Sequence, residues 1–227
     1  MGDGDWPSRR GAPPEEKDAI VYARSSTFDA HPSFIDEGIK HVRDTVMPAL
    51  ADIAGSAGMS LLVDRGSGLC IATSSWTDDE ALRASEAPVR QLRDRMAEVF
   101  HATATVSRWD IAALHRDHRS HQGAWVRVAW LEVEPGHLDR VIDVYKMSSL
   151  PAMHDLEGFC SSSLLVDPAA GRVVSSMTFD KAPPAGGGTS EVAENVGTSE
   201  MCESGARLLE VGEFELAIAH LHVPEMA

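Results

Sequence analysis

The feature that most constrains the fold is a sequence that occurs twice in the chain. The residues LLVD stand at 61–64 and again at 164–167, and a glycine follows each copy four positions later. When the chain is shifted by the 103 residues that separate the copies, about a quarter of positions 21–76 are identical without a gap. The matched pairs include the helix-breaking residues Pro32/Pro135, Pro48/Pro151, Gly55/Gly158 and Gly68/Gly171. The chain is therefore a tandem duplication, and each copy has about 100 residues, the usual size of a small domain.

Both copies predict the same order of elements, β-α-β-β-α-β, which is the ferredoxin-like unit. The helices are indicated by apolar residues at steps of three and four, and the hairpins by short loops between β-rich runs. In the first copy we expect strands at 19–27, 60–64, 69–76 and 107–115, with helices that start at Pro32 and after a capping residue, Thr77. In the second copy we expect strands at 124–133 and 213–222, a hairpin at 160–179, and helices from Pro135 and within 190–210.

One such unit carries helices on a single face of its sheet, so the other face must be covered. With two units in one chain, the bare faces can pack together into a closed β-barrel, favoured by about 25 cal/mol per Å² of buried apolar area. The predicted fold class is α+β, with two ferredoxin-like repeats packed sheet to sheet. The expected organisation is a disordered segment at 1–18, a first repeat at 19–115, a linker at 116–123 and a second repeat at 124–227.

The charge balance and the cysteines narrow the range of partners and locations. The chain has 20 Lys and Arg against 35 Asp and Glu, a formal net charge of −15, and an acidic surface repels nucleic acid and anionic membranes. No apolar run approaches the roughly 20 residues of a membrane-spanning helix, and the first residues do not resemble a secretory signal. Three widely spaced cysteines (Cys70, Cys160, Cys202) argue against a disulfide framework and for a cytoplasmic location.

The segment CIATSSWTDDEALRASEAPVRQLRDRMAEVF at 70–100 resembles the antibiotic-biosynthesis-monooxygenase-like (ABM-like) branch of the dimeric α/β-barrel superfamily. The likeness lies in a strand that ends in Trp76, a capped acidic turn, and a helix opened by Glu-Ala-Leu; the second copy keeps part of it at 173–183. The resemblance extends over nearly the whole chain after residue 18 and implies an intrachain dimeric α/β barrel. Because this superfamily contains oxygenases, isomerases, haem degraders and proteins of no known reaction, it leaves the activity open.

The resemblance implies one function and leaves two alternatives. The first is a cofactor-independent monooxygenase that acts on a small aromatic or quinol-like molecule. The second is a small-molecule-binding or regulatory barrel without turnover. The third, a haem or metal protein, is disfavoured, because haem-degrading members place a histidine about nine residues after the tryptophan, where this chain has Ser85. We therefore expect no cofactor and, as partner, a small hydrophobic or aromatic molecule; a homodimer stays an open alternative.

Two aromatic residues and two arginines stand at matching positions of the copies. Trp76 and Phe179 end equivalent strands, where they would line a pocket between sheet and helices or serve as core residues. Arg24 and Arg127 lie in the first strand of each copy, and an arginine on an apolar strand needs a partner. Each would bind an anionic substrate, stabilise a developing oxyanion, or form a structural ion pair with an acid such as Asp64 or Asp167. The catalytic candidates are Arg24 and Trp76, and the substrate-binding candidates are Tyr22, Trp76, Trp109, Arg127 and Phe179.

The histidines are a further candidate group. His115, His118 and His121 form an H-x-x-H-x-x-H pattern that could hold zinc or copper. A helix would spread the three side chains around its axis, and no cysteine or carboxylate stands at a recognisable fourth position, so we expect no metal. His220 and His222 share one face of the last strand, where a histidine could act as a general base or simply lie in solvent.

Overall fold

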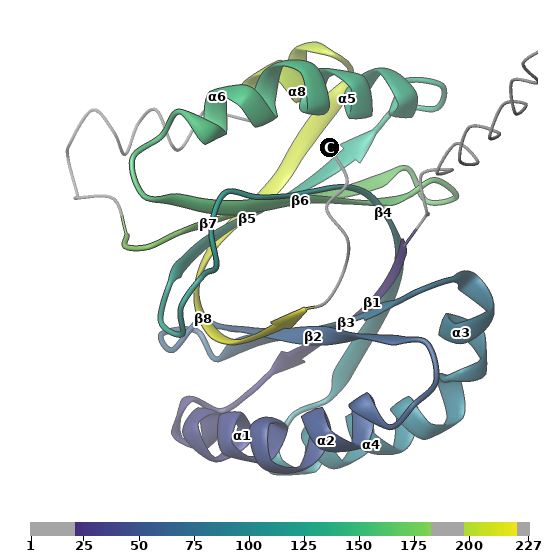
Figure 1. Ribbon diagram of the computed structural model, residues 1–227, viewed down its shortest axis with the longest axis vertical. Helices are drawn as coiled ribbons and strands as arrows, with labels where there is room; N and C mark the ends of the chain where they lie inside the picture. Colours follow the sequence, from purple (N-terminus) through teal and green to yellow (C-terminus); the bar gives the residue numbers. More distant parts are fainter. Residues whose placement is uncertain (1–20, 183–197, 222–227) are drawn as a thin grey trace, which may run out of the picture.

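The computed structural model describes residues 21–182 and 198–221, and in this part of the chain eight strands close into one barrel. Figure 1 shows the barrel between two groups of helices, one over each half. In repeat 1 the elements are β1 (Val21–Asp29), η1 (Pro32–Phe34), α1 (Ile35–His41), η2 (Val42–Val46), α2 (Met47–Ala51), β2 (Ser56–Val63), β3 (Leu69–Trp76), α3 (Asp79–Ala84), α4 (Glu86–Phe100) and β4 (Ala104–Arg116). In repeat 2 they are β5 (Trp125–Val133), α5 (Leu138–Val144), η3 (Tyr145–Ser149), α6 (Leu150–His154), β6 (Phe159–Asp167), β7 (Arg172–Phe179), α8 (Ser199–Glu203) and β8 (Ala206–Leu221).

The strand order of the barrel is β1-β3-β2-β8-β5-β7-β6-β4, and the paired strands are antiparallel. Each repeat contributes its strands in the same order, the fourth, first, third and second, which is the ferredoxin-like arrangement. The repeats join where β2 pairs with β8 and where β4 pairs with β6. The predicted α+β fold, two ferredoxin-like repeats that close one barrel within a single chain, is confirmed.

The repeated LLVD and glycine form the same hairpin in both copies. In repeat 1 the Asp64 carboxylate accepts a hydrogen bond from the backbone N–H of Gly66 at 2.8 Å. Gly68 has a φ of +88°, and a Cβ there would lie 2.0 Å from the carbonyl oxygen of Ala30. Only glycine permits this close approach of the chain that leaves β1. In repeat 2, Gly171 lies in the same way against the backbone of Val133.

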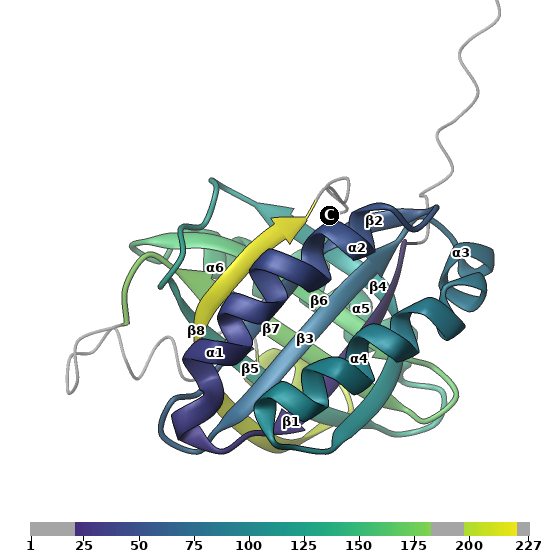
Figure 2. The ribbon, with the colours of Figure 1, turned by 90° about the horizontal axis from the view of Figure 1, so that it is seen from below.

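A proline inside the first long helix of each copy is accommodated by a π-helical turn. Pro48 lacks an N–H, and its ring would clash with the carbonyl four residues earlier in a regular α-helix. The segment η2 precedes it, and its last hydrogen bond runs from the N–H of Met47 to the carbonyl of Val42. Repeat 2 has the same turn, η3, before Pro151, where the N–H of Leu150 bonds to Tyr145. Figure 2 shows that α1 with α2 and α4 lie across the outer face of repeat 1.

Two local expectations were wrong. The residue that caps α3 is Asp78, whose carboxylate accepts from Ala81 N–H at 2.7 Å, while the Thr77 hydroxyl donates to that carboxylate. The strand β8 begins at Ala206, because it must pair first with β5 and then with β2 to join the repeats. The helix expected within 190–210 is therefore limited, among the described residues, to α8; residues 183–197 lie outside them, as does the expected segment 1–18.

Candidate functional site

The inside of the barrel holds a cavity of about 860 Å³, with walls from all eight strands. Alternate residues of a strand point to opposite faces, so one set of side chains faces the cavity and the other faces the helices. Hydroxyl side chains occupy matched positions of the two repeats, at Ser60/Ser163, Thr73/Ser176 and Ser75/Thr178. An eight-stranded barrel is just wide enough to be filled by side chains or to hold one small ligand. Because these residues are small, room for a ligand remains.

The wall also has a large apolar part, which includes the ring of Trp109. Trp109, on β4, donates its indole N–H to the hydroxyl of Ser25 at 2.8 Å. A second hydrogen bond, 2.7 Å long, joins the hydroxyls of Ser163 and Ser176 on adjacent strands. Further apolar residues in the wall are Leu62, Ile71, Ile111, Val126, Val128, Leu165, Val174 and Leu216. The cavity therefore combines an aromatic face, aliphatic walls and hydroxyl groups.

Titratable groups in the described wall are confined to the two ends of the barrel. Arg116, His118, Arg119 and His220 belong to the end where β4 and β8 finish, and Glu132, Arg172 and Glu210 to the other end. Between them the wall carries hydroxyl and apolar side chains. General acid–base catalysis needs a group that exchanges protons near the operating pH. The middle of the cavity can hold a molecule by shape and hydrogen bonding, but its described side chains include no such group.

Arg24 and Trp76 lie on the opposite face of repeat 1, between the sheet and the helices, and do not line the cavity. Arg24 is 1% exposed and donates to the carbonyl of Leu82 at 2.6 Å and to the hydroxyl of Ser85 at 3.0 Å. Its guanidinium lies 3.1 Å from a carboxylate oxygen of Glu86 and 5.8 Å from the centre of the Trp76 ring. Burial lowers the pKa of Arg24, and the charge of Glu86 offsets part of this effect. The arginine is thus held by three protein groups.

The ion-pair partner of Arg24 is Glu86, at the start of α4, rather than Asp64. Asp64 lies at the far end of β2, where it binds the hairpin turn instead. Burial of Glu86 opposes its ionisation, but the hydrogen bond from Arg108 and the charges of Arg24, Arg108 and Arg93 outweigh it. The pKa of Glu86 therefore lies below its ordinary value. These contacts favour the structural role of Arg24, an ion pair within the protein, over a role in binding substrate.

The sequence-predicted site residues fall into three separate places. Tyr22 packs against the apolar cluster of repeat 1 that contains Trp76. Phe179 lies in the equivalent cluster of repeat 2, 5.7 Å from the ring of Trp125. Arg127 is buried, at 7% exposure. Trp109 alone of the proposed substrate-binding residues lines the barrel cavity.

The hydroxyl residues of the cavity were not among the residues predicted from the sequence. Their signal was present as alternation in the two strands LCIATSSW and RVVSSMTF, where Thr73, Ser75, Ser176 and Thr178 share one face. Of the histidines, His220 lines the cavity near its end, His115 lies 5.6 Å from the ring of His154, and His222 is outside the described residues.

Three buried positions that are apolar in repeat 1 carry hydroxyl groups in repeat 2. Tyr145, Ser149 and Ser162 stand where repeat 1 has Val42, Val46 and Met59. Their three hydroxyl oxygens are buried and receive no hydrogen bond from the described residues. Burial raises the pKa of Tyr145 to about 12, and the nearby hydroxyls of Ser162 and Ser175 offset only part of that rise.

Comparison with known proteins places the chain in a family. No model of a known protein family matches it. Two proteins of Mycobacterium tuberculosis strain H37Rv, Rv2558 and Rv2557, are 52% and 51% identical to it over 215 and 207 residues. The matches cover 94% and 91% of this chain, and 91% and 92% of the relatives. The chain belongs to the family of Rv2558 and Rv2557. Both relatives are described as uncharacterized proteins.

Solved structures show the wider fold group. A candidate monooxygenase from Lactobacillus acidophilus superposes with a TM-score of 0.61 at 10% identity, over 87% of this chain and 93% of the other. An anthrone oxidase-like protein superposes with a TM-score of 0.58 at 13% identity, over 90% and 93%. At such identities the likeness establishes the fold alone. The Rv2558-type chain thus has the dimeric α/β-barrel fold, formed within one polypeptide. No helix among its described residues is long and apolar enough to cross a membrane.

Proposed function

We propose that the chain binds one small molecule inside its barrel and acts as a binding or regulatory protein without converting that molecule. The observation that carries this proposal is the cavity of about 860 Å³ with its repeat-matched hydroxyl groups. Ligand sites in proteins usually measure about 300–1,000 Å³ and combine apolar walls with a few polar groups. The cavity has both properties, and its middle lacks a titratable side chain among the described lining residues.

The chemistry of the wall indicates the class of ligand. The ring of Trp109 and the aliphatic residues favour an apolar, aromatic body, because burying such a surface contributes about 25 cal/mol per Å². Hydroxyl groups both donate and accept hydrogen bonds, so they suit carbonyl or hydroxyl substituents. The matched pairs Thr73/Ser176 and Ser75/Thr178 present such groups from both halves of the barrel. A flat aromatic molecule with oxygen substituents at both ends fits this arrangement.

The test is a thermal-unfolding screen of the full chain against aromatic and quinol-like molecules. A molecule that binds the folded state alone raises the melting temperature. We expect Ser176→Phe and its repeat equivalent Thr73→Phe, which fill the cavity, to abolish the shift. Thr105→Phe, at an exposed position that does not line the cavity, is the matched control and should retain it. Mass spectrometry should recover the bound molecule unchanged. A shift that survives both filling variants would reject the cavity as the site.

A second candidate is oxygenation of an aromatic or quinol-like molecule without a cofactor, in which Trp76 would stack against the substrate and Arg24 would stabilise negative charge on it. The contact of the Arg24 guanidinium with the Trp76 ring and the structural likeness to a candidate monooxygenase support it. Oxygen consumption during incubation with a quinol panel would detect this activity, and Arg24→Met should abolish it. Equal inertness in air and under anaerobic conditions would reject it and favour the binding protein.

A further inference from the structure

A cluster of metal-binding side chains lies where the connection between the repeats meets repeat 2. His118 belongs to that connection, Cys160 to the start of β6, and Asp180 follows the end of β7. One donor atom of each residue lies within 4.8 Å of the other two. The Asp180 carboxylate oxygen Oδ1 is 3.2 Å from His118 Nε2 and 3.4 Å from Cys160 Sγ. We propose that His118, Cys160 and Asp180 bind a divalent cation of the zinc type.

The distances suit one small cation. Zinc binds nitrogen and oxygen at about 2.0–2.2 Å and sulfur at about 2.3 Å in a tetrahedron, so neighbouring donors stand about 3.3–3.7 Å apart. Two of the three separations already lie near that range. A thiolate together with an imidazole favours zinc over magnesium or calcium, which prefer oxygen donors. His118 and Asp180 are each 42% exposed, whereas Cys160 is buried, so a cation can enter from solvent and rest on the sulfur.

A second group of residues orients the ligands. Asp117 binds the other ring nitrogen of His118, with 2.9 Å between Oδ2 and Nδ1. Histidine ligands of metals usually bind a carboxylate in this way, because it leaves Nε2 as the free donor and fixes the ring. His154 lies 3.7 Å from the other oxygen of Asp117.

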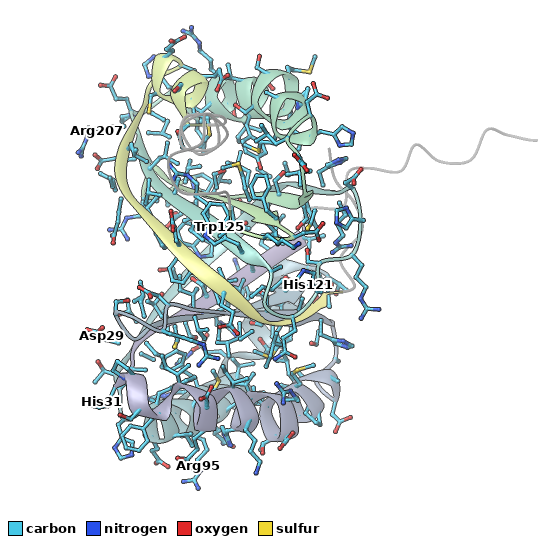
Figure 3. The ribbon with its side chains drawn as sticks, turned by 90° about the vertical axis from the view of Figure 1, so that its left-hand side faces the viewer. Asp29, His31, Arg95, His121, Trp125 and Arg207 are labelled. Atoms are coloured by element: carbon cyan, nitrogen blue, oxygen red, sulfur yellow. The ribbon has the colours of Figure 1, made fainter. Side chains whose placement is uncertain are left out.

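His121 lies next to the cluster, and it would have to leave its hydrogen bond to the Asp180 backbone to supply a fourth ligand. Its Nε2 lies 3.9 Å from Asp180 Oδ1 and 3.0 Å from the backbone oxygen of the same residue. Figure 3 shows His121 beside the end of β8. The H-x-x-H of the connection therefore brings both imidazoles to Asp180, although these histidines are 62 and 59 residues away from it in sequence. The structure supplies the cysteine and carboxylate that the sequence spacing did not reveal.

The fold itself does not require this cluster. Repeat 1 forms the same strands with Ala57 and Thr77 at the positions of Cys160 and Asp180. Without a cation, the Cys160 thiol donates to Asp180, and burial raises the pKa of the thiol to about 12. A bound zinc ion would replace the thiol proton, which leaves to solvent.

The test measures zinc binding to the full chain by calorimetry and by competition with a chromophoric chelator. We expect one ion per chain with a Kd below about 10 µM. Cys160→Ala and Asp180→Thr insert the residues of repeat 1, so the fold should tolerate them, and each should weaken binding at least about tenfold. Asp117→Asn should weaken it by about 10–100-fold. Cobalt should give a thiolate charge-transfer band that Cys160→Ala removes.

The matched control is Cys70→Val, which inserts the residue of repeat 2 at a second buried cysteine. It should retain full zinc affinity and the cobalt band. If the Cys160 variant unfolds, His118→Gln and Asp180→Thr decide the question. A wild-type Kd weaker than about 10 µM, or equal affinity in folded ligand variants, would overturn the proposal. The cluster would then be a hydrogen-bonded contact between the connection and repeat 2.

Discussion

Replacing Arg24 by methionine tests whether the charged layer of repeat 1 is structural. Methionine has a similar length and no charge, so it can fill the same space against Trp76. The change removes two hydrogen bonds, to Leu82 and Ser85, and the ion pair with Glu86. The carbonyl of Leu82 keeps a donor, because the Ser85 hydroxyl also binds it at 2.8 Å. No buried backbone group is therefore orphaned.

The magnitude follows from these contacts. Hydrogen bonds of a charged group contribute about 1.5–3 kcal/mol each, so the two together contribute about 3–6 kcal/mol. The pair with Glu86 adds at most about 1 kcal/mol, because that carboxylate is 42% exposed. Methionine avoids the desolvation of a buried charge, which costs several kcal/mol. We expect a net loss of about 2 kcal/mol, which lowers the melting temperature of a chain of this size by about 4–8 °C.

Urea unfolding followed by circular dichroism measures the change, and the thermal screen measures ligand binding in the same variant. Arg43→Met, at an exposed position of η2, is the control and should change stability by less than about 0.5 kcal/mol. Ligand binding in the barrel should persist in Arg24→Met, because Arg24 does not line the cavity. An unchanged unfolding free energy would refute the structural reasoning. If binding were lost at the same time, Arg24 would contact the ligand.

Three further predictions concern Tyr145, Gly38 and Glu86. Tyr145→Phe should raise the free energy of unfolding by about 1 kcal/mol, because it removes a buried hydroxyl that receives no hydrogen bond from the described residues. A lower free energy of unfolding in urea would instead indicate that a water or ligand binds this hydroxyl. Gly38→Ala should lower the free energy of unfolding by about 1–3 kcal/mol, since its Cβ would lie 2.0 Å from the Phe100 ring. In a double-mutant cycle, Phe100→Leu should restore part of this lost stability. Glu86 has a lowered pKa, so its contribution is present above its unfolded pKa and disappears as the pH falls through the lower folded value. The free energy of unfolding of Glu86→Gln should therefore fall less steeply below pH about 4 than that of the unchanged protein. Identical pH profiles of the two proteins would contradict this.

The order of elements could be predicted because it rests on local patterns. Apolar spacing, the prolines and the Asp–Gly hairpins act within a few residues, and their recurrence at 103 residues revealed the duplication. The barrel followed from the need to cover two bare sheet faces. The cap of α3 could not be predicted, because Asp78 and Thr77 are adjacent and both belong to the residue types that cap helices. The start of β8 could not be predicted either, because this strand extends to pair with strands of both repeats.

The sequence by itself determined a duplicated ferredoxin-like unit and a shared barrel, because secondary structure and sheet closure depend on apolar periodicity. Only the tertiary structure decided which face of the sheets keeps open space, since that depends on the summed volume of side chains from eight strands. It also decided the partner of Arg24 and the meeting of His118 with Cys160 and Asp180. These contacts join residues far apart in the chain, and their geometry is set by how strands and connections pack in space.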